Sequence, residues 1–178
     1  CNEKKIFELC SSLCAIGLDH NASKEIYTNP GSNNRMNEFQ AILGINQLSN
    51  LNKFIKHRVN VANWYLEGLQ ELLSQRKITL HSRPDNVTHS YWMFLVFIKS
   101  DDFIRKSLKE YLMSKNIFTN SPYQPLLHEQ PVFKGLKQLE GFEKSEQIAS
   151  RHINLPIHLK INKKDVEYIS QIFTNYFN

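Results

Sequence analysis

The chain has 178 residues, enough for one domain with a sizeable core, and its 41% hydrophobic content is that of an ordinary globular protein. Its 22 Lys and Arg exceed its 17 Asp and Glu by 22 − 17 = 5 charges, but they are scattered rather than gathered in a stripe, which argues against a nucleic-acid partner. No apolar run reaches 18 residues and no signal peptide is visible, so we expect no membrane partner and a cytoplasmic protein.

Residues 3–73 are expected to form two helices separated by a loop. Residues 3–16 have apolar side chains at spacings of three and four and predict a short amphipathic helix that ends at Gly17. Residues 18–34 are rich in Asn, Ser and Gly and predict a loop. Asn37 and Gln40 then fit a capping box that starts a long helix, which runs to about residue 73 with a kink or short break at 49–52.

The second part mixes strands and helices. Residues 78–82 suit a strand, and the unbroken apolar run 91–98 predicts a strand buried on both faces. Three helices are expected, one capped at Ser100 to Asp102, one at 143–152 and one capped by Asn162 with Asp165 in its first turn, and residues 117–133 form an irregular loop. This order predicts an α+β fold in which a small antiparallel sheet is packed with helices.

The three cysteines, Cys1, Cys10 and Cys14, form an odd, early cluster that does not predict a disulfide framework. A metal site would need a fourth ligand and tighter spacing, so we expect idle or buried thiols.

The segment 30–36 is the first candidate site, because a loop that enters a helix N-terminus offers free N–H groups to an anion. Gly31 allows a close backbone approach, Asn33 adds an amide donor, and Arg35 adds a planar cation that suits phosphate or carboxylate. An ordinary capped turn explains the same residues, and on physical grounds alone both interpretations stay open.

The proline-rich segment 123–131 is the second candidate, since it can hold Tyr123 and His128 rigidly toward a substrate. A purely structural loop, with His128 bonded to backbone, is the alternative. We expect His89 and His158 to be structural. The sequence contains no glycine-rich phosphate loop, no zinc-ligand motif and no nucleophile-elbow motif.

Several segments in the same order resemble the DegT/StrS family of pyridoxal-phosphate-dependent sugar aminotransferases. Gly31-x-Asn33-x-Arg35-Met36 and the helix after it, with Arg58, Tyr65 and Leu69, resemble that family's Gly-x-Asn-x-Arg-Met segment and the helix that follows it. His89-Ser-Tyr91, the loop from Tyr123 to Pro131, Leu155-Pro156-Ile-His158 and the helix at Asp165 continue the resemblance over almost the whole chain.

The resemblance implies a type I, aspartate-aminotransferase-like fold of which this chain is the C-terminal part. Residues 1–35 would be the end of the large-domain region plus an interface loop, and residues 36–178 the long connecting helix and the C-terminal small domain. It also implies a homodimer, or a pairing with the N-terminal half of the same enzyme, and amino transfer from glutamate to a keto-sugar nucleotide.

The resemblance further implies a role for each candidate residue. Asn33 would bind the phosphate of pyridoxal phosphate in the partner subunit's site. Arg35 would support that loop and bind substrate, and Tyr123 and His128 would bind substrate near the sugar-nucleotide entrance. The sequence departs from the family pattern at Ser32 and Asn34, where the family has aromatic residues, and at Pro122, where it has His.

The family's Schiff-base lysine and the acid that pairs with the pyridine nitrogen would lie before Cys1, because the lysines of this sequence stand in helix-surface contexts. A start at Cys1 rather than Met also suggests that the chain begins inside a larger protein. We therefore expect no catalytic residue within the chain, cofactor binding only together with the missing half, and no activity of the chain alone. A non-catalytic dimerisation or regulatory remnant and a family sugar dehydratase are the alternatives.

Overall fold

The computed structural model describes residues 2–82, 84, 86–99, 102–133 and 141–178. The chain forms two compact units, residues 1–51 and 52–178, and the boundary lies inside the long helix α2 (Glu38–Gly68). The predicted division at residues 35 and 36 stays a prediction. Among the described residues, no helix is long and apolar enough to cross a membrane.

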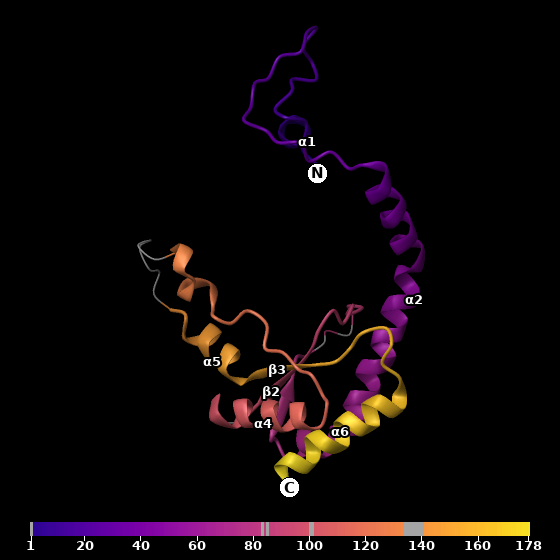
Figure 1. The fold of residues 1–178 in the computed structure, drawn as a ribbon, viewed down its shortest axis with the longest axis vertical. Coiled ribbons are helices and arrows are strands. Elements are labelled where there is room, and N and C mark those ends of the chain that lie inside the picture. The colour runs from indigo at the N-terminus through magenta and orange to yellow at the C-terminus, as the bar shows by residue number, and fades with distance from the viewer. Residues whose placement is uncertain (1, 83, 85, 100–101, 134–140) are drawn as a thin grey trace. The chain divides into compact units, whose positions relative to one another are not determined.

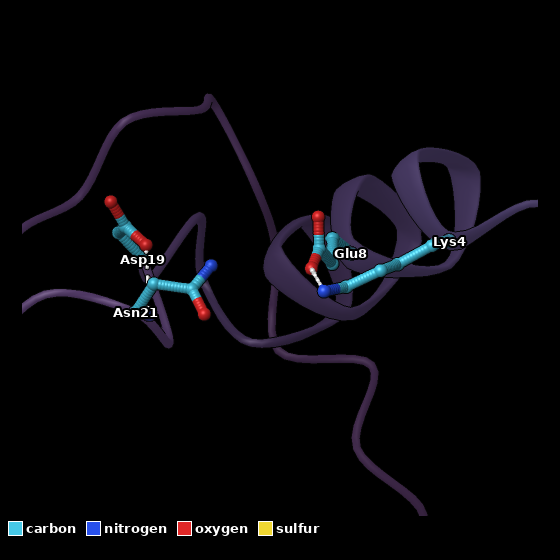
Figure 2. Close-up of polar contacts among 4 residues, drawn as sticks. All are labelled: Lys4, Glu8, Asp19 and Asn21. Atoms are coloured by element: carbon cyan, nitrogen blue, oxygen red, sulfur yellow. Dashed lines mark hydrogen bonds and ion pairs between the residues drawn. The ribbon is translucent and has the colours of Figure 1, made fainter.

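The first unit contains helix α1 (Lys4–Cys14), a long loop and the first part of α2 (Figure 1). The expected helix at 3–16 is thus confirmed within two residues at each end. An ion pair of 3.7 Å joins Lys4 to Glu8 one turn later, and the Asp19 carboxylate accepts a hydrogen bond from the Asn21 backbone N–H where the loop turns (Figure 2).

Helix α2 begins with the predicted capping box. The Asn37 side chain accepts a hydrogen bond from the Gln40 N–H at 2.9 Å, and the Gln40 side chain accepts one from the Asn37 N–H at 3.0 Å. Helix α2 runs unbroken through 49–52, so the predicted short break is wrong, and a kink there stays a prediction. Ser49 and Asn50 donate to the carbonyl of Asn46 within the helix. The helix is interrupted instead after Gly68, and the short helix α3 (Gln70–Ser74) follows.

The second unit is built on a three-stranded antiparallel sheet of order β1-β2-β3. Strands β1 (Ile78–Leu80) and β3 (His152–Leu155) flank the central strand β2 (Phe94–Ile98), with Ile78 opposite Ile98 and Phe94 opposite Leu155. Helices α4 (Asp102–Ser114), α5 (Glu143–Arg151) and α6 (Lys163–Phe177) pack around it, and two 3₁₀ turns, η1 (Leu127–Glu129) and η2 (Pro131–Phe133), lie in the proline-rich loop (Figure 1). The predicted fold class is confirmed.

The sheet differs from expectation in two details. First, strand β2 is shorter than the predicted 91–98, because Tyr91 has a positive φ of 46°, which is incompatible with a strand. Second, β2 is not buried on both faces as predicted, because alternate residues of the strand are only half-buried. Strand β3 replaces the end of the predicted helix 143–152. The predicted cap at Ser100 and Asp101 lies outside the described residues.

The core of the second unit joins the second part of α2 to the sheet and to α6. Its largest fully buried side chains include Tyr65, Leu69, Ile153 and Phe173. The Tyr65 hydroxyl donates to the Pro156 carbonyl at 2.9 Å, and its ring stacks on Phe94 at 4.9 Å. This contact fixes the segment that follows β3 against the long helix.

Candidate functional site

The loop that carries Asn33 is fastened to the end of α1 by backbone hydrogen bonds. The Ser32 N–H donates to Leu13, the Asn34 N–H donates to Cys14, and the Ile16 N–H donates to Ser32, at 2.9 to 3.2 Å. Because these bonds flank it on both sides, Asn33 has a fixed backbone position at the surface of the first unit.

Two glycines allow this close contact. A Cβ atom on Gly31 would lie 2.3 Å from the Gly17 nitrogen and 2.6 Å from the Leu13 carbonyl oxygen. Gly17 has a φ of +86°, and a Cβ there would lie 1.7 Å from the Asn29 oxygen. Gly31 therefore allows its loop to pack closely against the backbone that follows α1. The sequence suggested only that Gly31 would allow the close approach of a ligand.

The structure brings Asn33 and Arg35 together. The Arg35 Nε donates to Asn33 Oδ1 at 3.1 Å, and both side chains are exposed. This bond engages the carbonyl oxygen of the Asn33 amide and leaves its NH₂ group, and the terminal nitrogens of Arg35 also have no partner among the described residues. The pair therefore presents an amide donor beside a cation, which is the chemistry that a phosphate or carboxylate requires.

The start of α2 contributes less to this donor surface than expected. The N–H groups of Asn37 and Gln40 are already used in the capping box, and Glu38 places a negative charge in the first turn. The Asn33 and Arg35 side chains, rather than free helix N–H groups, are thus the donors available to an anion.

Tyr123 and His128 lie in the second unit and have different surroundings. Tyr123 has a positive φ of 64° and is 69% exposed. The His128 ring stacks on Phe142 with centroids 4.2 Å apart, its Nε2 lies 3.3 Å from Glu146 Oε1, and its side chain is only 17% exposed. His128 is therefore held against the start of α5 by packing and by a carboxylate, and the described residues show no contact between it and Tyr123.

His89 and His158 each make a local hydrogen bond to the backbone, and the expectation that both are structural stays a prediction. His89 Nδ1 accepts a hydrogen bond from the Tyr91 N–H at 2.9 Å, and His158 Nδ1 accepts one from the Lys160 N–H at 3.3 Å. Among the described residues there is no cluster of His, Cys, Asp and Glu that could hold a metal ion.

The small antiparallel sheet and the helices packed on it form an α+β unit of the kind found in type I aminotransferases. The model of the DegT/DnrJ/EryC1/StrS aminotransferase family matches residues 1–174, and the chain belongs to that family. Pyridoxal phosphate is the cofactor of this family, and a structural neighbour from Streptococcus pneumoniae, the putative sugar aminotransferase Spr1654, is known in PLP and PMP forms.

The curated relatives are longer than this chain. It is 26% identical over 170 residues to the dTDP-4-amino-4,6-dideoxy-D-glucose transaminase of Shigella dysenteriae, covering 95% of this chain and 45% of that protein. It is 25% identical to the GDP-perosamine synthase of Escherichia coli O157:H7, covering 99% of this chain and 46% of that protein. The chain therefore spans about half the length of these relatives.

Solved structures share the fold. The aminotransferase TlmJ from Streptoalloteichus hindustanus superposes with a TM-score of 0.85 at 21% identity over 99% of this chain and 46% of its own. The Spr1654 PMP form gives 0.84 at 19% identity over 99% of this chain and 44% of its own.

The residues of this chain fit one part of a pyridoxal phosphate site. The donor pair of Asn33 and Arg35 suits the phosphate group of the cofactor. No described lysine is buried, and Lys77, one of the two that are half-buried, donates its ammonium to the Phe177 carbonyl at 2.8 Å.

Proposed function

We propose that this chain is the C-terminal part of a cytoplasmic, pyridoxal-phosphate-dependent aminotransferase that acts on keto-sugar nucleotides in amino-sugar biosynthesis. In this proposal the Schiff-base lysine belongs to a part of the family fold outside residues 1–178. The chain supplies the small domain and part of the cofactor's phosphate site, and is inactive alone. The curated relatives named above are a dTDP-4-amino-4,6-dideoxy-D-glucose transaminase and a GDP-perosamine synthase, and these names of nucleotide-linked sugars support the substrate class.

The observation that carries the proposal is the donor pair of Asn33 and Arg35. When bound, the cofactor supplies the electron sink for amino transfer. This chain would hold the cofactor's phosphate through the Asn33 amide N–H, with Arg35 fixing the amide orientation through its bond to Oδ1. Tyr123, exposed on its loop, would contact the sugar nucleotide, and His128 would hold the same loop on α5.

The first part of α2 supports a partner, either a second copy or the N-terminal half of the same enzyme. Six large apolar side chains in the first part of α2 and just before it are between 64% and 79% exposed: Met36, Phe39, Ile42, Leu43, Ile45 and Leu48. So many exposed large apolar side chains within one short segment are typical of a surface that a partner covers.

A reconstitution experiment tests the proposal. The purified chain is mixed with pyridoxal phosphate and glutamate, reduced with borohydride and mapped for labelled lysines. We expect scattered, substoichiometric labelling without turnover, since no described lysine is buried. One stoichiometric lysine adduct together with glutamate-dependent turnover would refute the missing-lysine part of the proposal.

The role of Asn33 is tested in the assembled enzyme, with the complementary half added in trans. Asn33→Ala removes one hydrogen bond to a charged group, which costs roughly 1.5–3 kcal/mol, or about 10- to 150-fold in the Kd of pyridoxal phosphate. Asn34→Ala is the matched control, because the Asn34 amide donates to Ser32 Oγ within its own loop. Equal cofactor affinity in both variants would contradict the phosphate role.

A further inference from the structure

A groove of about 670 Å³ lies in the second unit, and neither Asn33 and Arg35 nor Tyr123 and His128 line it. Its walls come from the second part of α2, the segment after α4, the turn after β3 and the start of α6. Its apolar lining includes Trp92 and Phe118, which are 65% and 73% exposed. Together these two rings place a large apolar area on the lining of one groove, which is where apolar surface is typical of a binding site.

Two buried polar atoms in this groove lack a hydrogen-bond partner. They are Arg58 Nε and Thr119 Oγ1, and no described residue pairs with either. An unsatisfied buried polar group is costly, and a guanidinium more so than a hydroxyl, so a ligand that pairs with Arg58 would recover that free energy.

The one carboxylate in the groove does not neutralise Arg58. Asp165 Oδ2 accepts the Asn162 N–H at 2.9 Å in the capping box of α6, and Asp165 makes no ion pair with Arg58. The charge of Asp165 is thus directed to the N-terminus of its own helix, and Arg58 remains available to a carboxylate from elsewhere.

The combination of an unpaired arginine, an exposed tryptophan and apolar walls is that of protein-binding hot spots, where Trp and Arg dominate the energy. A small anion would satisfy Arg58 but would leave Trp92 and Phe118 uncovered. An extended peptide segment with a carboxylate between apolar side chains would satisfy both, and the groove volume lies in the range of sites that bury several side chains.

We propose that this groove docks an extended polypeptide segment whose carboxylate side chain pairs with Arg58 and whose apolar side chains cover Trp92 and Phe118. We assign that segment to the portion of the family fold that the relatives have and residues 1–178 do not, a source that rests on the proposed function. The portion is long enough to supply it, since the chain spans only 45% of the Shigella dysenteriae relative.

Two blocked peptides that differ in one group test the carboxylate. They are acetyl-Ser-Leu-Glu-Leu-Ser-amide and its Gln counterpart, titrated into the full chain while the indole N–H signals are followed by NMR. Trp92 reports on the groove, and Trp64, which packs against the core, is the internal reference. We expect at least a tenfold preference for the Glu peptide and a shift confined to Trp92.

Variants then assign the preference to Arg58. Arg58→Gln should abolish it and Arg58→Lys should retain part of it. The matched control Arg151→Gln, which removes an exposed arginine from α5, should leave it unchanged. Trp92→Ala should weaken both peptides about equally, because it removes packing and no charge. Equal binding of the two peptides to the unaltered chain, or an unchanged preference in Arg58→Gln, overturns the proposal.

Two further arms identify the source of the carboxylate. Propionate that binds as tightly as the Glu peptide would make this a small-anion site and would overturn the docking assignment. The part of the Shigella dysenteriae transaminase that this chain does not match should displace the Glu peptide, and failure to compete overturns the assigned source. None of these readouts uses catalysis. A chain that binds the peptide but gives no turnover with the complementary half added in trans would therefore count against the proposed function and leave the groove standing.

Discussion

Removing one hydroxyl from the core tests how the long helix is joined to the segment after β3. In Tyr65→Phe the ring keeps its stacking on Phe94, and the hydrogen bond to the Pro156 carbonyl is lost. Tyr65 is fully buried, and no other hydrogen bond to this carbonyl is present among the described residues. Pro156 is half-buried, so the loss is that of an ordinary intramolecular hydrogen bond, about 0.5–1.5 kcal/mol, and urea denaturation at pH 7 should show a loss of that size.

The pH dependence gives a second, independent signature. Burial, and after it the charge of Asp165, raise the pKa of Tyr65 above its ordinary value of about 10. Above pH 10 the unfolded chain therefore loses this proton more readily than the folded chain, and the stability contributed by the protonated hydroxyl declines as pH rises. Tyr65→Phe lacks that decline, so the stability difference between the two proteins should narrow above pH 10, by at most about 1.4 kcal/mol per pH unit.

Tyr168→Phe is the control, because this exposed hydroxyl donates to the Lys115 carbonyl at a longer 3.3 Å, and its loss should change stability by less than about 0.5 kcal/mol. The argument fails if Tyr65→Phe is as stable as the unaltered chain at pH 7, or if the difference between them does not change between pH 9 and pH 11.

Two packing and capping predictions concern α6. A Cβ on Gly68 would lie 2.5 Å from Ser170 Oγ, so Gly68→Ala should destabilise by about 1–2 kcal/mol in thermal unfolding despite the better helix propensity of Ala, and should become neutral or stabilising in a Ser170→Gly background. A loss that persists in that background would exclude the clash. Asn162→Ala should cost about 1 kcal/mol because it removes the N-cap bond to Asp165, whereas Asn162→Asp should keep most of that stability, and equal losses in the two variants would contradict the capping role.

Helix starts were predictable from the sequence because their determinants are local. The box of Asn37 and Gln40 and that of Asn162 and Asp165 each join two side chains three residues apart to each other's backbone. Such pairs need no tertiary partner, so the spacing alone identified them. The central position of residues 94–98 followed in the same way from an apolar run that only a buried strand accommodates.

The errors arose where distant residues decide the structure. Strand β3 exists because His152 to Leu155 pair with β2, and Asn154 Oδ1 also accepts the Phe94 N–H at 2.9 Å. These partners lie about sixty residues earlier, and four residues carry too little periodicity to reveal them. The predicted break at 49–52 failed for the opposite reason: Ser and Asn favour loops on average, but here their side chains bond to a helical carbonyl and tolerate the helix.

The candidate site shows the same division. The contact between Asn33 and Arg35 is local and lies within a motif that the sequence presents. The groove at Arg58 depends on the unpaired state of one arginine and the exposure of Trp92 and Phe118, and neither property has a sequence signature. The predicted buried strand 91–98 included Trp92, and that prediction is wrong for this residue, which is 65% exposed.

Donors without partners occur in both units, and they have different energetic consequences. The Asn33 and Arg35 donors are exposed to water. The net free energy of binding an anion there is therefore only the difference between its hydrogen bonds to these donors and the hydrogen bonds to water that they replace. Arg58 Nε and Thr119 Oγ1 are buried, so their desolvation cost is already present in the folded chain and is recovered when a partner pairs with them. In the two proposals, a partner that pairs with Arg58 therefore adds to the free energy of assembly, and the loop at Asn33 adds selectivity for the anionic group of the cofactor.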